Sequence, residues 1–353
     1  MNRAAHSDLL FERRGTAGLV ALNRPHALNA VTGAMVRALA HQLAEWEVDA
    51  AVTRVILAAN GGRAFSAGGD LRALYDLGRA GRYDEALKFF REEYALNTQI
   101  KRYRKPYVAL IDGIVMGGGV GISVHGSHRV AGDKFVFAMP EVGIGFFPDV
   151  GGTWFLPRLP GELGTYCALT GERLAASDAV AAGVATHRVD SGRFPELLEA
   201  LCGAIPVDAV LAAFAQTPGE GPVMAERGAI DRVFAGGRVE DILAGLDATA
   251  AGGADAAFAS AAAALMRTKS PTSLKLALAQ MRRGRALDFV ECMRTEFRIV
   301  SRVVHGHDVY EGIRAVIIDK DQSPRWQPST LEGVSAPEVE RHFAPLAREL
   351  ELP

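Results

Sequence analysis

Cysteine is scarce in this sequence of 353 residues, which contains only Cys167, Cys202 and Cys292. The three are far apart, their number is odd, and none belongs to a C-x-x-C or Cys/His ligand pattern. These features exclude a disulfide-stapled scaffold and argue against a structural zinc site. The simplest interpretation is a reducing compartment, which is the cytoplasm, or the mitochondrial matrix if the chain is eukaryotic and processed.

Long apolar runs and a bias toward one charge are also lacking. Asp112, Arg129 and Asp133 interrupt the most apolar region, so no uncharged apolar stretch reaches the length of about 18 residues that spans a bilayer. Residues 1–18 have no apolar core of a secretory signal. The net charge of -2 gives no overall field that would attract nucleic acid or an anionic membrane. We therefore expect a small-molecule partner, no nucleic acid and no membrane.

Strand-like and helix-like segments alternate along the first part of the chain. The pattern predicts a strand pair over 9–22 with a turn at 14–16, a helix over 29–47, a strand over 53–59, a helix from about residue 70, a strand over 105–111 and a helix over 120–128. Such alternation is typical of an α/β architecture. After residue 158 the pattern is mainly helical, with a break at 251–254 and a helix start at Ser270-Pro271.

Two glycine turns follow predicted strands, one at Gly69 and one at Gly118. A glycine leaves room beside its backbone amide, so a ligand oxygen can approach the N–H closely. A helix that begins after Gly118 would add its positive dipole end, which favours an oxygen that gains negative charge. The two amides could therefore grip one carbonyl oxygen. For an arbitrary pair of glycines, a tight turn or close packing is the commoner explanation.

Four segments resemble the signature segments of the crotonase (enoyl-CoA hydratase/isomerase) superfamily, in the same order and with similar spacing. They are Leu22–Ala30 (LNRPHALNA), Ala64–Leu71 (AFSAGGDL), Met116–Gly121 (MGGGVG) and Met139–Glu141 (MPE). Further segments resemble the thioester hydrolase branch of that superfamily. They are Phe90–Tyr94 (FREEY), Phe147–Gly152 (FPDVGG), Gly306–Asp308 (GHD) and Glu311–Pro324 (EGIRAVIIDKDQSP), so the resemblance extends over residues 9–326.

The resemblance implies a crotonase-like spiral of repeated ββα units followed by a helical C-terminal region. We therefore divide the chain into a spiral core with the acyl-CoA site over residues 1–205 and a mainly helical region for capping and oligomerisation over residues 206–353. A homo-oligomer is the implied assembly. The implied partner is an acyl-CoA, which brings its own CoA, so no metal, flavin or nicotinamide cofactor is expected.

The resemblance also assigns roles to five positions. It implies that the amides of Gly69 and Gly118 hold the thioester oxygen, and that Glu141 either attacks the thioester carbon or activates a water. Asp149 would bind the 3-hydroxyl of the substrate. Glu93 would add a second polar contact, although an isolated glutamate is more often a solvated surface charge.

One catalytic residue of the hydratases is missing. Their first catalytic glutamate falls on Gly121, which cannot act as an acid or base, and the second matches Glu141. Hydration of a double bond is therefore disfavoured, and the space at Gly121 would seat a differently shaped acyl group.

The remaining predicted contacts lie around the first glycine turn and at the CoA phosphates. Ala67, Asp70 and Leu71 flank Gly69 and are expected to line the substrate site. Arg24, His26 and Lys320 are candidates for the phosphates, with His26 at a position where relatives often carry lysine. His125 and His128 lie three apart on the predicted helix, and His305 and His307 lie near the C-terminal motif. Without further ligands, we expect packing or surface roles for His125 and His128, and the resemblance places His305 and His307 in a structural C-terminal segment.

The expected function is hydrolysis of a 3-hydroxyacyl-CoA thioester, with 3-hydroxyisobutyryl-CoA of valine catabolism as the implied substrate. Two alternatives remain, an enoyl-CoA hydratase/isomerase and a non-catalytic scaffold that binds acyl-CoA or RNA. Gly121 argues against the first, and the intact set of Gly69, Gly118, Glu141 and Asp149 argues against the second. The sequence leaves open the acyl-chain preference and whether Glu141 is a nucleophile or a base.

Overall fold

Two β-sheets form the centre of the computed structural model, which describes residues 8–353. The six-stranded sheet has the order β1 (Leu9–Arg14), β2 (Ala17–Leu22), β3 (Arg54–Ala59), β5 (Tyr107–Ile111), β7 (His128–Ala131) and β10 (His187–Arg188). The four-stranded sheet has the order β4 (Ala64–Ser66), β6 (Ile114–Met116), β8 (Val136–Ala138) and β9 (Leu174–Ala175). All neighbours pair in parallel except β1 with β2 and β8 with β9.

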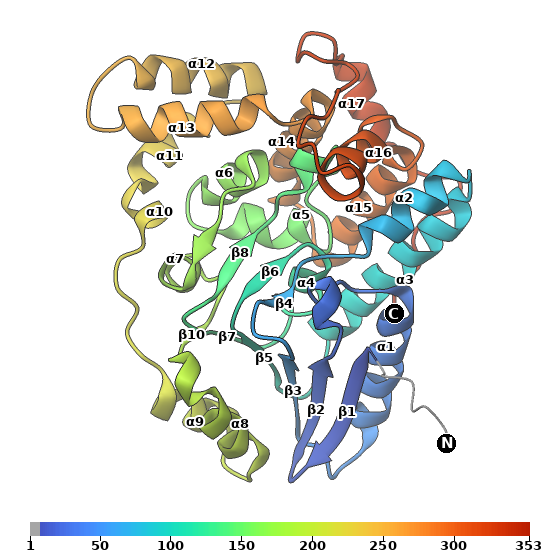
Figure 1. Ribbon diagram of the computed structural model, residues 1–353, viewed down its shortest axis with the longest axis vertical. Helices are drawn as coiled ribbons and strands as arrows, with labels where there is room; N and C mark the ends of the chain where they lie inside the picture. The colour runs from blue at the N-terminus through green and yellow to red at the C-terminus, as the bar shows by residue number, and fades with distance from the viewer. Residues whose placement is uncertain (1–7) are drawn as a thin grey trace.

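The two sheets arise from a repeated unit. The successive pairs β3–β4, β5–β6 and β7–β8 each add one strand to the six-stranded sheet and the next strand to the four-stranded sheet. The chain therefore advances as a spiral, which Figure 1 shows from β3 to β8. This confirms the α/β spiral that the resemblance implied.

Helices cover the spiral and make up most of the chain after residue 158. Those of the spiral are η1 (Pro25–Ala27), α1 (Gly33–Val48), α2 (Leu71–Arg79), α3 (Tyr83–Lys101), α4 (Gly118–Gly121), η2 (Glu141–Ile144), α5 (Gly152–Phe155), η3 (Leu156–Arg158), α6 (Leu163–Thr170), α7 (Ala176–Ala181), η4 (Ser191–Arg193) and α8 (Phe194–Cys202). The later ones are α9 (Val207–Phe214), α10 (Pro222–Ala225), α11 (Arg227–Val233), α12 (Val239–Ala250), α13 (Ala256–Arg267), α14 (Pro271–Gly284), α15 (Phe289–Val303), α16 (Asp308–Ile313), η5 (Arg314–Ile318) and α17 (Ala336–Phe343).

The helices begin where the sequence offers caps. Thr32, Asp70 and Ser270 accept hydrogen bonds from the first turns of α1, α2 and α14, which satisfies backbone donors that no helical carbonyl can reach. Pro271 occupies the first position of α14, as expected. The predicted break at 251–254 is confirmed, because α12 ends at Ala250 and α13 begins at Ala256.

The predicted helix over 120–128 is wrong. Only one helical turn, α4, follows the triple glycine, and His128 already begins β7, where it pairs with Val108 of β5. The reason is tertiary, because the sheet recruits residues whose local pattern resembles a helix. A single turn also has a weaker dipole than the longer helix we expected.

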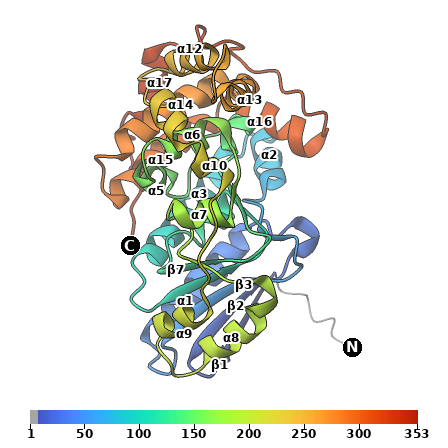
Figure 2. The same cartoon turned by 90° about the vertical axis from the view of Figure 1, so that its left-hand side faces the viewer.

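The hydrophobic core continues across the predicted division at residue 205. One cluster of buried apolar side chains runs from Leu9 to Leu350 and includes residues of the spiral and of α12–α17. A second cluster lies under the six-stranded sheet, where α8 and α9 pack with residues on both sides of residue 205. Figures 1 and 2 show α8 and α9 at the end of the molecule away from α12 and α13. The division at 205 stays a prediction, and the two regions share their core.

Glycines permit one close contact that positions the later site. In α16, a Cβ on Gly312 would lie 2.3 Å from the backbone carbon of Ile144 in η2. Gly145 has a left-handed φ of 69°, and a Cβ there would lie 2.2 Å from the backbone of Asp308. The backbones of α16 and η2 therefore touch with no side chain between them.

Gly312→Ala should destabilise the protein. Alanine normally stabilises a helix interior by about 1 kcal/mol relative to glycine. Here the added methyl group would force η2 and α16 apart, so we expect a net loss of about 1–3 kcal/mol in the free energy of unfolding. Urea denaturation measures it. Gly228→Ala in α11 is the matched control, because its nearest neighbour would be a flexible arginine tip at 3.7 Å. Equal stability changes in both variants would contradict the packing argument.

Candidate active site

A cavity of about 680 Å³ lies where the two predicted glycine turns meet the C-terminal helices. Its wall contains most of the predicted site. It is lined by Ala67, Gly68, Gly69, Asp70, Leu71, Leu74, Phe89, Phe90, Glu93, Met116, Gly117, Gly118, Pro140, Glu141, Gly143, Ile144, Phe146, Asp149, Thr170, Gly171, Glu172, Arg173, Leu265, Lys269, Val309, Val316, Ile317 and Gln322.

The amides of Gly69 and Gly118 converge at this cavity. A Cβ on Gly118 would lie only 3.3 Å from the amide nitrogen of Gly69, so the two turns approach each other as closely as the missing side chains allow. Within residues 8–353, neither amide donates a hydrogen bond to a backbone or side-chain acceptor. Two adjacent donors without acceptors on a cavity wall are available to bind an oxygen of a ligand.

Glu141 lies at the start of η2, directly after Met139 and Pro140 of the β8 loop. Its side chain is buried, and its Oε2 atom has no hydrogen-bond partner in the part of the chain that the structure describes. Burial, and then the charge of Asp149, raise the pKa of Glu141 well above its usual value. A buried carboxyl with a free oxygen on a cavity wall is available to act on a ligand.

Asp149 lies near the end of the loop between η2 and α5 and is held by a tyrosine. The hydroxyl of Tyr94 in α3 donates a hydrogen bond of 2.9 Å to its Oδ2 atom, and both side chains are buried. Burial raises the pKa of Asp149 to about 7, against the opposing effect of the Tyr94 hydrogen bond. The sequence did not single out Tyr94, one residue after Glu93.

Glu93 is buried, so the surface interpretation of this residue is wrong. It lies on α3, and its Oε1 atom has no hydrogen-bond partner among residues 8–353. That atom would lie 2.7 Å from a Cβ on Gly118, which places the carboxyl directly beside the glycine turn. Burial, and then the charges of Asp149 and Glu296, raise the pKa of Glu93 well above its usual value.

The loop after Asp149 is held from behind by two residues that the sequence did not reveal. Glu296 of α15 accepts hydrogen bonds of 2.8 Å from the amides of both Gly151 and Thr153. Gln280 of α14 donates to the hydroxyl of Thr153 at 2.6 Å. Their signal in sequence is weak, because each lies more than 120 residues from its partner.

The same loop contains an unfavourable backbone conformation. Val150 has a φ of 49°, which a β-branched residue rarely adopts. His125 stabilises this turn, because its Nε2–H donates to the Val150 carbonyl at 2.7 Å, and burial lowers the pKa of His125 to about 4, so the ring is neutral. A strained residue directly after Asp149 is consistent with a functional loop.

Gly121 does not lie on the cavity wall, which corrects its predicted role. A Cβ on Gly121 would lie 2.8 Å from both the side-chain nitrogen of Asn97 and the Cβ of Val150. These neighbours fill the space that we expected an acyl group to occupy. Asn97 itself is fully buried, and neither polar atom of its amide has a partner within the described residues.

The predicted phosphate contacts lie elsewhere. Arg24 pairs with Asp70 at 3.0 Å and with Asp8 at 3.9 Å, and neither it nor His26 nor Lys320 is among the residues that line the cavity. The cations on the wall are Arg173 and Lys269, which the sequence did not indicate. Ala67, Asp70 and Leu71 line the cavity as predicted.

The other histidines pack against neighbours. His128 bonds to Asp208 at 2.8 Å, His305 lies against the Tyr83 ring with centroids 4.3 Å apart, and His307 bonds to Asp308 at 3.1 Å. Over residues 8–353, no group of three or more His, Cys, Asp or Glu side chains is arranged to hold a metal ion. None of the helices in this part of the chain is long and apolar enough to cross a bilayer.

A spiral of ββα units that brings two glycine amides beside buried carboxyl groups defines the crotonase class of proteins. The chain belongs to the enoyl-CoA hydratase/isomerase family, whose model matches residues 17–343. The mitochondrial 3-hydroxyisobutyryl-CoA hydrolase of Danio rerio is 47% identical, over 100% of this chain and 94% of that protein. The corresponding protein of Homo sapiens is 42% identical, over 97% and 90%.

Solved structures agree on the fold. A carnitinyl-CoA dehydratase from Mycobacterium thermoresistibile is 44% identical with a TM-score of 0.93 and covers 98% of each chain. An enoyl-CoA hydratase from Rhodobacter sphaeroides is 39% identical with a TM-score of 0.91, over 98% of this chain and 100% of that one. Each of these proteins is named for a reaction of a CoA ester, and the named reactions differ.

Glu296 should make the stability of the protein depend on pH. Burial raises its pKa from 4.5 to about 8, so the folded state holds a proton that the unfolded state releases above pH 4.5. The contribution of Glu296 to the free energy of unfolding is complete below pH 4.5 and is lost as the pH rises through about 8. We expect Glu296→Gln to flatten the fall in the free energy of unfolding over this window, measured by urea denaturation at several pH values. The exposed Glu332→Gln is the control, and an unchanged slope in Glu296→Gln would contradict the assignment.

Proposed function

We propose that the protein hydrolyses 3-hydroxyisobutyryl-CoA to 3-hydroxyisobutyrate and CoA, a step of valine catabolism. The observation that carries the proposal is the set of three buried acids, Glu93, Glu141 and Asp149, around two amides that lack acceptors. The hydrolase relatives at 42–47% identity support it. CoA enters as part of the substrate, so the reaction needs no further cofactor.

The amides of Gly69 and Gly118 receive the thioester oxygen. Attack on the thioester carbon moves negative charge to this oxygen, and two donors fixed in a buried site stabilise that charge more in the transition state than in the ground state. The attacking atom is either an oxygen of Glu141 or a water that Glu141 deprotonates. In both routes the C–S bond breaks, the sulfur leaves as a thiol after protonation, and one water is consumed.

Asp149 recognises the 3-hydroxyl group of the substrate. Its Oδ2 atom accepts from Tyr94, which leaves Oδ1 for the substrate. Glu93 stands beside the oxyanion glycines and adds a polar contact on the other side. Arg173 and Lys269 are the wall cations suited to the CoA phosphates, in place of Arg24 and His26.

Hydration of an enoyl-CoA is the second candidate, because two solved structures of high similarity bear hydratase or dehydratase names. Gly121 cannot supply the first of the two acids of that reaction, and its flank is filled. Glu93 is the specific observation in favour, since it places another carboxyl near Gly118. A scaffold without activity would leave the buried acids without a purpose. The proposed setting is the cytoplasm, or the mitochondrial matrix of a eukaryote, and the hydrolase relatives are mitochondrial by name. A homo-oligomer is the proposed assembly.

Thiol release separates the candidates. Purified protein should release thiol from 3-hydroxyisobutyryl-CoA and leave the enoyl absorbance of crotonyl-CoA unchanged. Glu141→Gln should lower kcat by about 10²–10⁴-fold, because the amide can neither attack nor take a proton. Glu172→Gln, on the same cavity wall, is the matched control. Loss of enoyl absorbance without thiol would replace the hydrolase with the hydratase, and full activity of Glu141→Gln would remove Glu141 from the mechanism.

The 3-hydroxyl preference should depend on pH. Because the pKa of Asp149 is raised to about 7, its carboxylate, the stronger acceptor for the hydroxyl, forms as the pH rises through 7. We expect kcat/KM for 3-hydroxyisobutyryl-CoA to rise through this pH, and Asp149→Asn to remove the rise and lower kcat/KM by about 10²-fold or more. Isobutyryl-CoA, which lacks the hydroxyl, is the control substrate and should show neither the part of the rise that depends on Asp149 nor the loss in Asp149→Asn. The same pH profile for both esters would refute the role of Asp149.

A further inference from the structure

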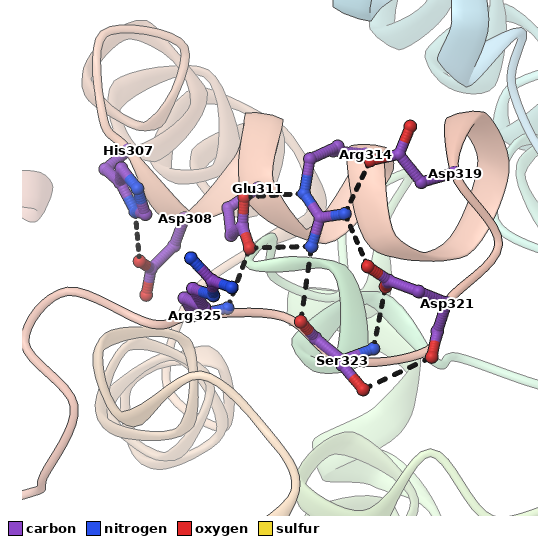
Figure 3. A network of polar contacts seen from close by, with 8 residues as sticks. All are labelled: His307, Asp308, Glu311, Arg314, Asp319, Asp321, Ser323 and Arg325. Carbon is purple, nitrogen blue, oxygen red and sulfur yellow. Dashed lines mark hydrogen bonds and ion pairs between the residues drawn. The ribbon is translucent and has the colours of Figure 1, made fainter.

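The C-terminal region supplies part of the cavity wall, and most of that part comes from the segment 308–325. It contributes Val309, Val316, Ile317 and Gln322. It consists of α16, the π-helix η5 that continues it, and an irregular loop. Figure 3 shows its polar residues around one arginine, Arg314.

This segment packs against two elements that lie next to proposed site residues. Its helix α16 packs against η2, which begins with Glu141, through the close approach at Gly312. It also packs against α2, which begins two residues after Gly69, where Gly78 leaves space for the ring of Tyr310. A shift of the segment would therefore change the shape of the cavity.

The backbone of the segment does not hold its shape by itself. A π-helix is rare, and Lys320 and Gln322 have left-handed φ angles of 59° and 55° although neither is glycine. Such conformations persist only where surrounding contacts fix them, and they occur often at functional sites.

Arg314 supplies those contacts. Its Nε and Nη2 donate to the two carboxylate oxygens of Glu311, each at 2.9 Å. Its Nη1 donates to Asp319 at 2.6 Å and to Asp321 at 2.7 Å, and its Nη2 also donates to the Ser323 carbonyl at 3.2 Å. The guanidinium thus joins η5 to residues before, between and after the left-handed Lys320 and Gln322.

We infer that Arg314 is a positioning residue for substrate binding, which fixes Val316, Ile317 and Gln322 as the wall against which the CoA ester rests. The identity of this ligand rests on the proposed function. Lysine cannot replace the arginine, because one ammonium group cannot form the paired bonds to Glu311 and still reach both aspartates. Without the fork, the carboxylates of Glu311, Asp319 and Asp321 repel one another and release the loop.

Arg314→Lys separates wall positioning from general stability. We expect KM for 3-hydroxyisobutyryl-CoA to rise about tenfold or more while kcat stays within about threefold, because the wall binds ground state and transition state alike. Arg298→Lys is the matched control. Arg298 also joins two acids, Glu291 at 2.7 Å and Glu349 at 2.9 Å, and is not among the cavity residues. It should lower Tm and leave KM unchanged. An unchanged KM in folded Arg314→Lys would overturn the inference.

A double-mutant cycle tests whether Arg314 acts through the wall. Val316→Ala should weaken binding in the wild type and have a much smaller effect in Arg314→Lys, because the wall is already displaced there. Fully additive effects would overturn the inference.

Calorimetric binding of a dethia analogue, with carbon in place of the thioester sulfur, keeps this test apart from the proposed function. If the wild type binds the analogue but hydrolyses no ester, the proposed function fails, and weaker binding by Arg314→Lys still supports the wall. If the wild type hydrolyses the ester and Arg314→Lys binds the analogue as tightly, the inference alone fails.

Discussion

The burial of several carboxyl groups in one place is the constraint on which the rest of the structure depends. Glu93, Glu141, Asp149 and Glu296 are all buried, and each has its pKa raised chiefly by the loss of solvent. Their polar partners are a tyrosine hydroxyl and two backbone amides rather than cations. An ionised carboxylate in such surroundings is unfavourable, so near neutral pH fewer than four of these carboxyl groups are ionised at the same time. The fold must hold these acids together against their own repulsion.

Close backbone contacts and long-range hydrogen bonds keep these acids in position. The turn that begins with Glu141 is pressed against α16 through Gly145 and Gly312, where any side chain would collide with backbone. The loop that carries Asp149 is held by His125 from one side and Glu296 from the other. Two of the acids, Glu141 and Asp149, thus lie on elements whose movement is restricted by neighbours far away in sequence. This restriction keeps both carboxyl groups in a fixed position before a ligand enters the cavity.

The sequence predicted the parts of the site that are local and failed on those that are not. Glycine turns directly after strands indicated Gly69 and Gly118, and the loop motif indicated Asp149, because in each case neighbouring residues carry the signal. Tyr94, Gln280 and Glu296 were missed because their roles depend on partners that only the fold brings near. The helix over 120–128 was wrong for a related reason, since pairing of His128 with β5 outweighs local periodicity. Arg24 was assigned to phosphate, but its nearest carboxylate is Asp70.

The glycine at position 121 is a packing constraint on the loop that carries Asp149. The amide of Asn97 and the side chain of Val150, the residue after Asp149, occupy its flank, so a Cβ there would lie 2.8 Å from each. A larger side chain at this position would displace Asn97 or the loop. Glu93 on α3 places a carboxyl beside Gly118, with its Oε1 atom 2.7 Å from the position that a Cβ of Gly118 would take. Glu93 beside Gly118 and Asp149 bonded to Tyr94 suit the proposed substrate, because its hydroxyl group can donate to a carboxylate and thereby lower the energy of its charge.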